Sequence, residues 1–308
     1  MTNLLLLCLV IFFQVVAFCE PPKDPSHGPL SFSQMIESTR SSVVKIYCET
    51  ESFPHDHLSD GTGFFVNNDG IVVTANHVIT MPDNSQCQRI TIALPLHGFK
   101  DERGNSISQS FNELKTSVSA VDLAHDIAIL KPETNPLGPS YRGGMDIVDM
   151  GKRVNIPLFD RASATIDEAP INGGYEIFVS GYPLDQPNLI TASGYIATSG
   201  AVDFDIHNRV MLDVYWADIR VNPGNSGGPV FSKATGAVVG IVKAVAEAPA
   251  DLDPQQLGHA YGFDQRSIQE GRPQVHPILY NSGITYIVPS KYIADLLKKS
   301  AIPFNEAH

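Results

Sequence analysis

The sequence predicts an all-β protein built from short antiparallel strands, arranged as barrels or sandwiches. Apolar, β-branched runs such as SVVKIYC (42–48), RITIAL (89–94) and IAILK (127–131) recur along the chain and are separated by turn residues. The 308 residues include 24 Gly and 22 Pro, and only 18% are charged. This composition is typical of a strand-and-loop protein rather than a helical bundle or a disordered chain.

The N-terminus has the character of a secretory signal. Residues 4–19 carry no charge and are almost wholly apolar, but Gln14 interrupts the run. A membrane-spanning helix needs about 20 such residues, and the small residues Ala17 and Cys19 suit cleavage before Glu20. We expect residues 1–19 to be removed and the protein to be exported, to a periplasm or outside the cell; an uncleaved anchor is the alternative.

Residues 20–40 are expected to form an N-terminal arm, Pro-rich at first and with a short helix over FSQMIEST (32–39). Two of the four cysteines lie in the expected signal, so the mature chain keeps Cys48 and Cys87. An oxidising compartment favours a disulfide between these two, with separate buried thiols as the alternative.

The net charge excludes some classes of partner. A formal charge of −12 and a pI of about 5.2 argue against binding nucleic acid or an anionic membrane by charge alone. We therefore expect no nucleic-acid partner and no membrane contact beyond the signal segment.

The remaining elements follow from local patterns. In GTGFFVNNDGIVVTANHVI (61–79), Asp69-Gly70 predicts a hairpin turn, because glycine accepts the positive φ that such turns require. Residues 132–172 show no clear period, and about 246–281 are expected to form a long loop. Further strands and a final helix are predicted over 115–122, 175–183, 190–200, 209–219, 228–231, 236–245 and 290–299.

The final helix is expected to begin with Ser290 as its cap. Tyr292, Ile293, Leu296 and Leu297 would form its apolar face.

The segment NPGNSGGP (222–229) surrounds Ser226 with glycine and proline. A serine hydroxyl attacks a carbonyl only with a nearby base and with donors for the oxyanion that forms. Glycines let a substrate approach the backbone, and Pro223 has no N–H. The candidate oxyanion donors are therefore the amides of Gly224 and Ser226.

Two upstream residues fit the other roles. His77 lies at the end of an apolar strand, and Asp126 directly precedes another. A histidine in such a place is more often a packed structural residue, and an aspartate more often a turn or cap residue. A serine, a histidine and an aspartate that each lie at a strand edge nevertheless point together to nucleophilic catalysis.

The segments TANH, DIAIL and GNSGGPV resemble the three catalytic segments of the chymotrypsin-fold serine proteases. GTGFFVNNDGIVVTANHVI, DLAHDIAILK, VNPGNSGGPVF and GITYIVPSKYIADLL resemble more closely the HtrA/Deg branch, and the likeness covers most of residues 40–300. It implies His77 as general base, Asp126 as the group that fixes its tautomer, and Ser226 as nucleophile, in the chain order of chymotrypsin.

The resemblance also implies a fold. We expect two antiparallel six-stranded β-barrels, at about 41–135 and 150–290, followed by a helix at about 290–299. The protease domain would span 41–300, with the site between the barrels. It would need no cofactor and no metal.

The chain departs from this branch in several ways. The intervals from His77 to Asp126 and from Asp126 to Ser226 are long for it, so insertions are expected in surface loops. Asn225, not aspartate, precedes the serine, so activation by a cleaved N-terminus is not expected. We expect no PDZ domain after the last helix, and hence no peptide sensing by that route, and the oligomeric state is left open.

Substrate preference depends on a few positions. Val221, Val245 and Ala246 would form a modest apolar pocket that favours Val, Ile or Ala before the cut bond. The alternative turns Arg220 into the pocket, which would favour acidic side chains; a solvated Arg220 fits the sequence better.

Other tempting residues have simpler interpretations. His55, Asp56 and His57 fit a solvated loop better than a metal site. His125 would point away from the face that Asp126 uses. The acids Glu247, Asp251 and Asp253 fit a mobile acidic lid.

The sequence thus predicts an exported serine endopeptidase that cuts unfolded or extended polypeptides through an acyl-enzyme. The alternatives are a silent protease-fold binding or chaperone-like protein, and an esterase on the same fold.

Overall fold

The structure is a computed structural model of the 308-residue chain. It describes residues 30–51, 56–81, 83, 85–95, 111–138, 145–149, 152–156, 161–206, 209–249 and 279–307. The expected signal, His55 and the acids Asp251 and Asp253 lie outside these ranges. Within them, no helix is long and apolar enough to cross a membrane.

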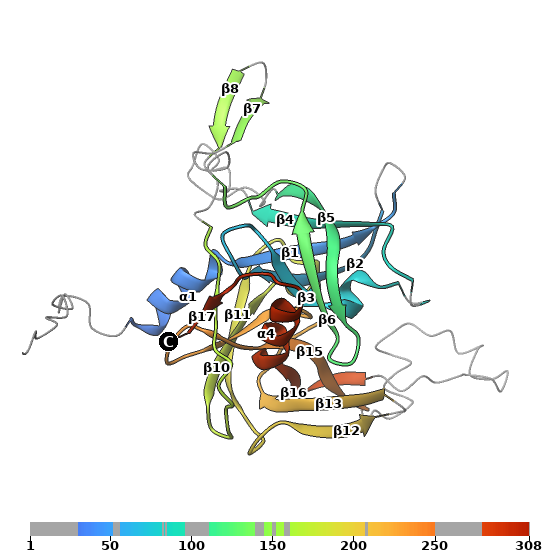
Figure 1. Ribbon diagram of the computed structural model, residues 1–308, viewed down its shortest axis with the longest axis vertical. Coiled ribbons are helices and arrows are strands. Elements are labelled where there is room, and N and C mark those ends of the chain that lie inside the picture. Colours follow the sequence, from blue (N-terminus) through green and yellow to red (C-terminus); the bar gives the residue numbers. More distant parts are fainter. Residues whose placement is uncertain are drawn as a thin grey trace, which may run out of the picture.

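Six antiparallel strands close the first barrel in the order β1-β2-β3-β6-β5-β4. It forms the blue and green upper part of Figure 1. Its strands are β1 (Val43–Glu49), β2 (His57–Phe65), β3 (Val72–Ala75), β4 (Arg89–Pro95), β5 (Phe111–Asp122) and β6 (Ile127–Pro132).

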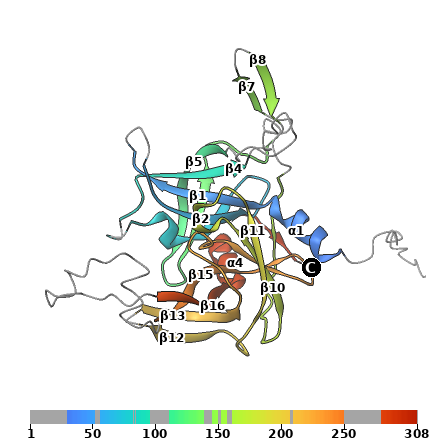
Figure 2. The ribbon, with the colours of Figure 1, turned by 180° about the vertical axis from the view of Figure 1, so that it is seen from behind.

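Six further strands close a second antiparallel ring, in which β10 pairs with β11, β11 with β13, β13 with β16, β16 with β15, β15 with β14 and β14 with β10. Figure 2 shows this barrel below the first, with β12 beside β13 at its lower edge. Its strands are β10 (Glu176–Gly181), β11 (Ile190–Ile196), β13 (Arg209–Asp218), β14 (Pro229–Ser232), β15 (Val238–Pro249) and β16 (Leu279–Pro289). The predicted pair of six-stranded barrels is therefore confirmed.

Several short strands lie outside the two rings. β7 (Met145–Asp149) and β8 (Lys152–Ile156) form a separate two-stranded sheet within the stretch that showed no period. β12 (Val202–Ile206) was not predicted, and β9 (Thr165–Ile166) and β17 (Asn305–Glu306) pair in parallel beside β15. The strands β15 and β16 also take in Ala246–Pro249 and Leu279–Asn281, so the expected loop over 246–281 is wrong at both its ends.

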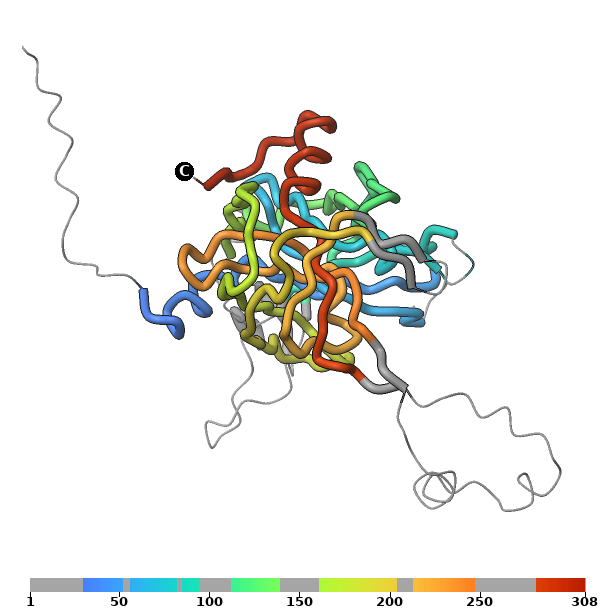
Figure 3. Tube along the Cα trace, turned by 90° about the horizontal axis from the view of Figure 1, so that it is seen from below, coloured from blue at the N-terminus to red at the C-terminus, as the bar shows by residue number. Residues whose placement is uncertain are grey.

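Two helices flank the barrels. The short helix expected near residue 32 is α1 (Phe32–Arg40), where Ser31 and Gln34 form a capping box. The final helix is α4 (Ser290–Lys299), but its cap is Pro289. Ser290 instead lies in the first turn and donates its hydroxyl to the Asp167 carbonyl, which corrects the expected cap. Figure 3 shows α4 and the chain end, in red, on one side of the molecule.

Three apolar clusters form the core. One fills the first barrel and contains Ile46, Phe65 and Ile92; another fills the second and contains Ile177, Val230 and Ile287. The third joins residues of both barrels to α4, whose Ile293 and Leu297 are fully buried. The two barrels thus share an apolar cluster, and its burial fixes their relative position.

The two cysteines predicted to pair are joined by a disulfide. Cys48 is the penultimate residue of β1 and Cys87 precedes β4, with their Cα atoms 5.5 Å apart. Both side chains are buried in the cluster that fills the first barrel.

Candidate functional site

His77 lies in a single 3₁₀ turn, η1 (Asn76–Ile79), directly after β3. The sequence predicts His77 at the end of a strand. In the structure β3 ends just before it, and the turn changes the direction of the chain at His77. Val78 and Ile79 are buried and anchor the turn, whereas the His77 side chain is 46% exposed. The imidazole is therefore accessible from solvent on a firmly packed support.

Asp126 holds His77 by two hydrogen bonds. Its Oδ2 lies 2.6 Å from Nδ1 of the ring, and its Oδ1 accepts the His77 backbone N–H at 2.9 Å. The Asp126 carbonyl also accepts the Asn76 N–H at 2.9 Å. A carboxylate on Nδ1 fixes the ring orientation and leaves Nε2 for a reaction partner. Within the described residues, Nε2 of His77 has no hydrogen-bond partner.

The backbone of Asp126 is unusual. It lies in the turn between β5 and β6 with φ of 62°, which is uncommon for a residue other than glycine. Residues in such conformations cluster at functional sites, where the surrounding structure holds them in place.

A lysine of the second barrel lies in the electrostatic surroundings of this carboxylate. Burial lowers the pKa of Lys243, while the negative charges of Asp126 and Asp122 oppose that effect. Lys243 belongs to β15, so both barrels contribute charge near Asp126.

The Ser226 loop lies against the His77 turn. The Ser226 carbonyl accepts the Thr62 N–H at 2.9 Å. A Cβ atom on Gly61 would lie 3.1 Å from that carbonyl and 2.5 Å from Val78, the residue after His77. A Cβ atom on Gly227 would lie 2.6 Å from the amide of Ala75. The structure thus brings the segments of all three candidate residues together. Only glycine at positions 61 and 227 allows the backbones of these segments to come so close.

The residues before Ser226 form a turn with the features of type II. The Asn225 N–H donates to the Asn222 carbonyl at 3.0 Å, with Pro223 and Gly224 between them. Gly224 has φ of 94°, the sign that type II requires at its third position. Neither the Gly224 amide nor the Ser226 amide donates to any acceptor among the described residues. Both amides therefore remain available for a ligand.

Thr62 connects this loop to the second barrel. Its hydroxyl donates to the Gly224 carbonyl at 2.6 Å and accepts the Tyr182 N–H at 3.0 Å. Sequence reasoning missed this role, although GTG at 61–63 placed a small polar residue between two glycines at the start of an apolar strand.

The predicted pocket residues lie on two neighbouring segments. Val221 is buried in the apolar cluster of the second barrel, and Val245 packs partly buried against it. Ala246 follows in β15, and its carbonyl accepts the Ser282 hydroxyl at 2.7 Å. Arg220 is exposed and runs past Gly283, 3.9 Å from where that glycine would carry a Cβ atom.

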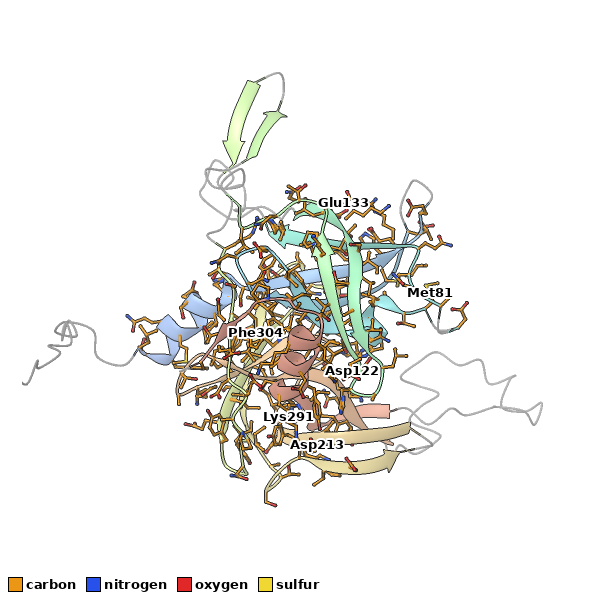
Figure 4. All side chains as sticks on the ribbon, viewed as in Figure 1. Met81, Asp122, Glu133, Asp213, Lys291 and Phe304 are labelled. Atoms are coloured by element: carbon orange, nitrogen blue, oxygen red, sulfur yellow. A yellow bond between two sulfur atoms is a disulfide. The ribbon has the colours of Figure 1, made fainter. Side chains whose placement is uncertain are left out.

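His125 does not share the Asp126 position. It lies in a turn rather than a strand, with Nδ1 2.8 Å from Asp122 Oδ2 and its ring stacked on Tyr292 of α4 at 3.5 Å between centroids. Figure 4 shows Asp122 at the β5–β6 hairpin, and Asp213 and Lys291 beside β13 and α4. The hairpin that carries Asp126 is thereby fastened to the second barrel.

His57 also differs from the expected solvated loop. It begins β2, stacks on Tyr47 and places Nε2 3.0 Å from the buried Glu49 carboxylate. Glu113 lies close enough that these three residues could hold a cation. Arg89 and Thr91 already occupy the other Glu49 oxygen at 3.1 Å each, so the group forms an ion-pair network.

Comparison with known proteins identifies relatives. A probable periplasmic serine endoprotease DegP-like of Pseudomonas fulva is 26% identical over 181 residues, covering 59% of this chain and 28% of that protein. The protein of the same description from Hahella chejuensis is 27% identical and covers 61% and 30%. A putative serine protease HhoA of Synechocystis is 27% identical and covers 67% and 40%. The chain thus matches less than half the length of each.

The family described as "Trypsin-like peptidase domain" matches residues 61–241, which include His77, Asp126 and Ser226. This match extends from the second strand of the first barrel to β15 and covers more than half of the chain. The chain therefore belongs to the trypsin-like peptidase domain family, with distant DegP/HtrA-like homologues.

Proposed function

We propose that the protein is an exported serine endopeptidase that hydrolyses peptide bonds in unfolded or extended polypeptides. Ser226 is the nucleophile, His77 the general base, and Asp126 the residue that orients His77. The observation that carries the proposal is the double hydrogen bond of Asp126 to His77, at 2.6 Å to the ring and 2.9 Å to the backbone. Such a bond serves a histidine that must keep one tautomer and one orientation.

The reaction follows from these groups. Nε2 of His77 takes the proton of the Ser226 hydroxyl as Oγ attacks the substrate carbonyl carbon, and the amides of Gly224 and Ser226 bind the resulting oxyanion. His77 then gives its proton to the leaving amine, which leaves an acyl-enzyme that water hydrolyses in the same way. General-base catalysis contributes about 10²–10⁴ in rate, and one oxyanion donor about 10²–10³.

The substrate class follows from the family and from the lining of the site. A peptidase family implies polypeptide substrates. Val221 and Val245 belong to the apolar cluster of the second barrel, and together with Ala246 they would form a pocket wall suited to Val, Ile or Ala before the cut bond. Export rests on the apolar run at residues 4–19 and on relatives whose names describe periplasmic proteases.

A fluorophosphonate probe tests the nucleophile, because it phosphonylates only an activated serine. We expect the wild-type chain to label and Ser226→Ala to lose all labelling. Ser193→Ala is the matched control, since Ser193 is an exposed serine of β11 with no part in the proposed mechanism, and this variant should label like the wild type.

The result also separates the alternatives. A folded wild-type chain that never labels contradicts the proposal and supports a binding or chaperone-like protein. A chain that labels and turns over esters but leaves unfolded protein intact supports an esterase. Sequencing the products from a denatured proteome then tests whether Val, Ile and Ala precede the cut bonds.

A further inference from the structure

A buried lysine links the first barrel to a loop of the second. Lys45 lies in β1 with a side chain only 1% exposed. Its Nζ donates to Asp185 Oδ1 at 2.5 Å and lies 3.7 Å from Asp60 Oδ2. A buried ammonium is stable only with a partner of opposite charge, and the direct hydrogen bond goes to Asp185. Asp185 belongs to the loop between β10 and β11.

Lys45 remains charged in this setting. Burial by itself lowers the pKa of Lys45, but the hydrogen bond to Asp185 and the charges nearby outweigh that effect and raise it above the ordinary value. The Lys45 ammonium therefore stays protonated across the neutral pH range.

The loop that is bonded to Lys45 has a backbone conformation that residues with side chains rarely adopt. Leu184 has φ of 55° and ψ of 39°, and Asp185 has φ of 53°. Two successive residues with side chains rarely adopt the left-handed conformation, because the Cβ atom approaches the following carbonyl. The Leu184 side chain is 58% exposed, so burial of that side chain does not hold the loop. The Lys45–Asp185 contact is the charged one among the bonds that hold the loop, beside the Gln186 N–H, which donates to the Pro183 carbonyl at 3.0 Å.

This loop in turn holds the peptide that precedes Gly224. The Leu184 N–H donates to the Pro223 carbonyl at 2.7 Å. The carbonyl and the N–H of a trans peptide point in opposite directions, so this bond turns the Gly224 N–H away from Leu184. Rotation of the same peptide would convert the type II turn to type I and reverse the N–H.

We infer that Lys45 and Asp185 are positioning residues for the oxyanion hole. Their ion pair keeps Leu184 and Asp185 in the left-handed conformation, which keeps the Leu184 amide on the Pro223 carbonyl and the Gly224 N–H toward the reacting carbonyl. The inference rests on the proposed peptidase function, since an oxyanion hole has a role only there.

No other charged group of the loop has this role. The residue before Ser226 is Asn225, which is buried and neutral. Thr62 holds the Gly224 carbonyl and therefore acts on the next peptide of the chain. The charge that orients the Pro223–Gly224 peptide comes from β1 of the other barrel.

The test compares Asp185→Asn with the wild type in turnover of a fluorogenic peptide. Asparagine accepts a positive φ about as readily as aspartate, so this change removes the charge and leaves the local preference. We expect kcat to fall about tenfold or more with KM changed less than twofold, because the oxyanion forms only in the transition state. Lys45→Met should act in the same way.

Lys115→Met is the matched control. Lys115 lies in β5 of the same barrel and pairs with Glu51 at 3.2 Å, but the two side chains are 36% and 58% exposed. It should leave kcat and KM unchanged. If Lys45→Met does not fold, Asp185→Asn still decides the question, because the Asp185 side chain is 73% exposed.

A rescue separates positioning from general stability. Adding Leu184→Gly to Asp185→Asn removes the backbone cost of the left-handed conformation at position 184 and should restore kcat at least threefold. A purely structural ion pair predicts loss of stability without this rescue.

The outcomes are distinct from those of the proposed function. A wild-type chain that does not label with fluorophosphonate contradicts the peptidase itself. A wild-type chain that labels, together with an Asp185→Asn variant of equal kcat, overturns only the role of the ion pair.

Discussion

At the scale of single residues, Gly224 meets two demands at once. Its φ of 94° requires glycine, and a Cβ atom there would collide with the Tyr182 carbonyl oxygen. Its amide is one of the two left available beside Ser226, and its carbonyl is held by Thr62. Any side chain at this position would therefore change the turn that presents the amide.

Gly224→Ala should lower kcat about 10²-fold or more, because displacement of the turn removes an oxyanion donor. Turnover of a fluorogenic peptide gives kcat, and urea denaturation gives the free energy of unfolding. Gly174→Ala is the control: Gly174 has φ of 85°, but a Cβ atom there would meet nothing within 4 Å. This control should lose about 1 kcal/mol of stability and no activity. Equal kcat in both variants would contradict the role of Gly224.

At the scale of elements, the β5–β6 hairpin is fastened to α4. Asp122 bonds to His125, His125 stacks on Tyr292, and Tyr292 donates to Asp213 of β13. Lys291 adds an ion pair to Asp213 at 2.5 Å. Because Asp126 follows His125 directly, this contact holds the turn that orients His77.

Asp122 makes this contact dependent on pH. Burial opposes its ionisation, but the hydrogen bonds from His125 outweigh that effect and lower its pKa. A carboxylate whose pKa is lower in the folded state stabilises the fold above its unfolded pKa of about 4, and this stability is lost as pH falls through the folded pKa.

Asp122→Asn should therefore lower the free energy of unfolding by about 1 kcal/mol at pH 7, and this difference should shrink below pH 4. Urea denaturation of both proteins at pH 7 and pH 3 measures it. The control Asp69→Asn changes an exposed aspartate of the β2–β3 turn whose carboxylate has no hydrogen bond among the described residues, and it should leave the free energy of unfolding unchanged at both pH values. A difference that stays constant between the two pH values would exclude ionisation of Asp122 as its cause.

The sequence predicts the barrel strands better than the connections. Short apolar runs bounded by turn residues locate β1, β4 and β6 within a residue or two, because burial on a sheet determines their composition. β7, β8 and β12 were missed: VDFDI (202–206) carries a period-2 alternation that the interpretation overlooked, and β7 and β8 are five-residue strands inside a Pro- and Gly-rich stretch.

The residues of the site also differ in how far the sequence predicts them. Ser226, His77 and Asp126 carry local signals, and the structure brings His77 and Asp126 into direct contact. Lys45 was read only as one residue of a strand, and Asp185 received no role. Their partnership joins residues 140 positions apart, and only the packing of one barrel on the other creates it. A lysine inside the otherwise apolar run SVVKIYC was the one local sign.

At the scale of the whole molecule, the two barrels share a core and a hydrogen-bond junction. Thr62 of the first barrel bonds to Gly224 and Tyr182 of the second, and its side chain is fully buried. Loss of this junction should therefore affect stability and activity together.

Thr62→Val should cost about 1–3 kcal/mol of stability, because it removes the hydroxyl from a buried site at nearly constant volume. It should also lower kcat, since the Gly224 carbonyl loses its donor. Thr116→Val is the matched control. Thr116 is also buried, but its hydroxyl donates to the Ile90 carbonyl at 3.1 Å within the first barrel. The control should lose similar stability and keep its kcat. Identical kcat in the two variants would show that the junction has no part in catalysis.

The segment after α4 touches both halves of the molecule. The Pro303 carbonyl accepts from the Asn67 side chain of the β2–β3 turn, the Asn305 N–H donates to Val66, and the Ala307 N–H donates to Ile166 of β9. β9 itself pairs with β15 of the second barrel. Detachment of this C-terminal tail and separation of the barrels are therefore thermodynamically linked. A ligand that displaced the tail would also weaken the contacts between the two barrels, at a distance from its own binding site.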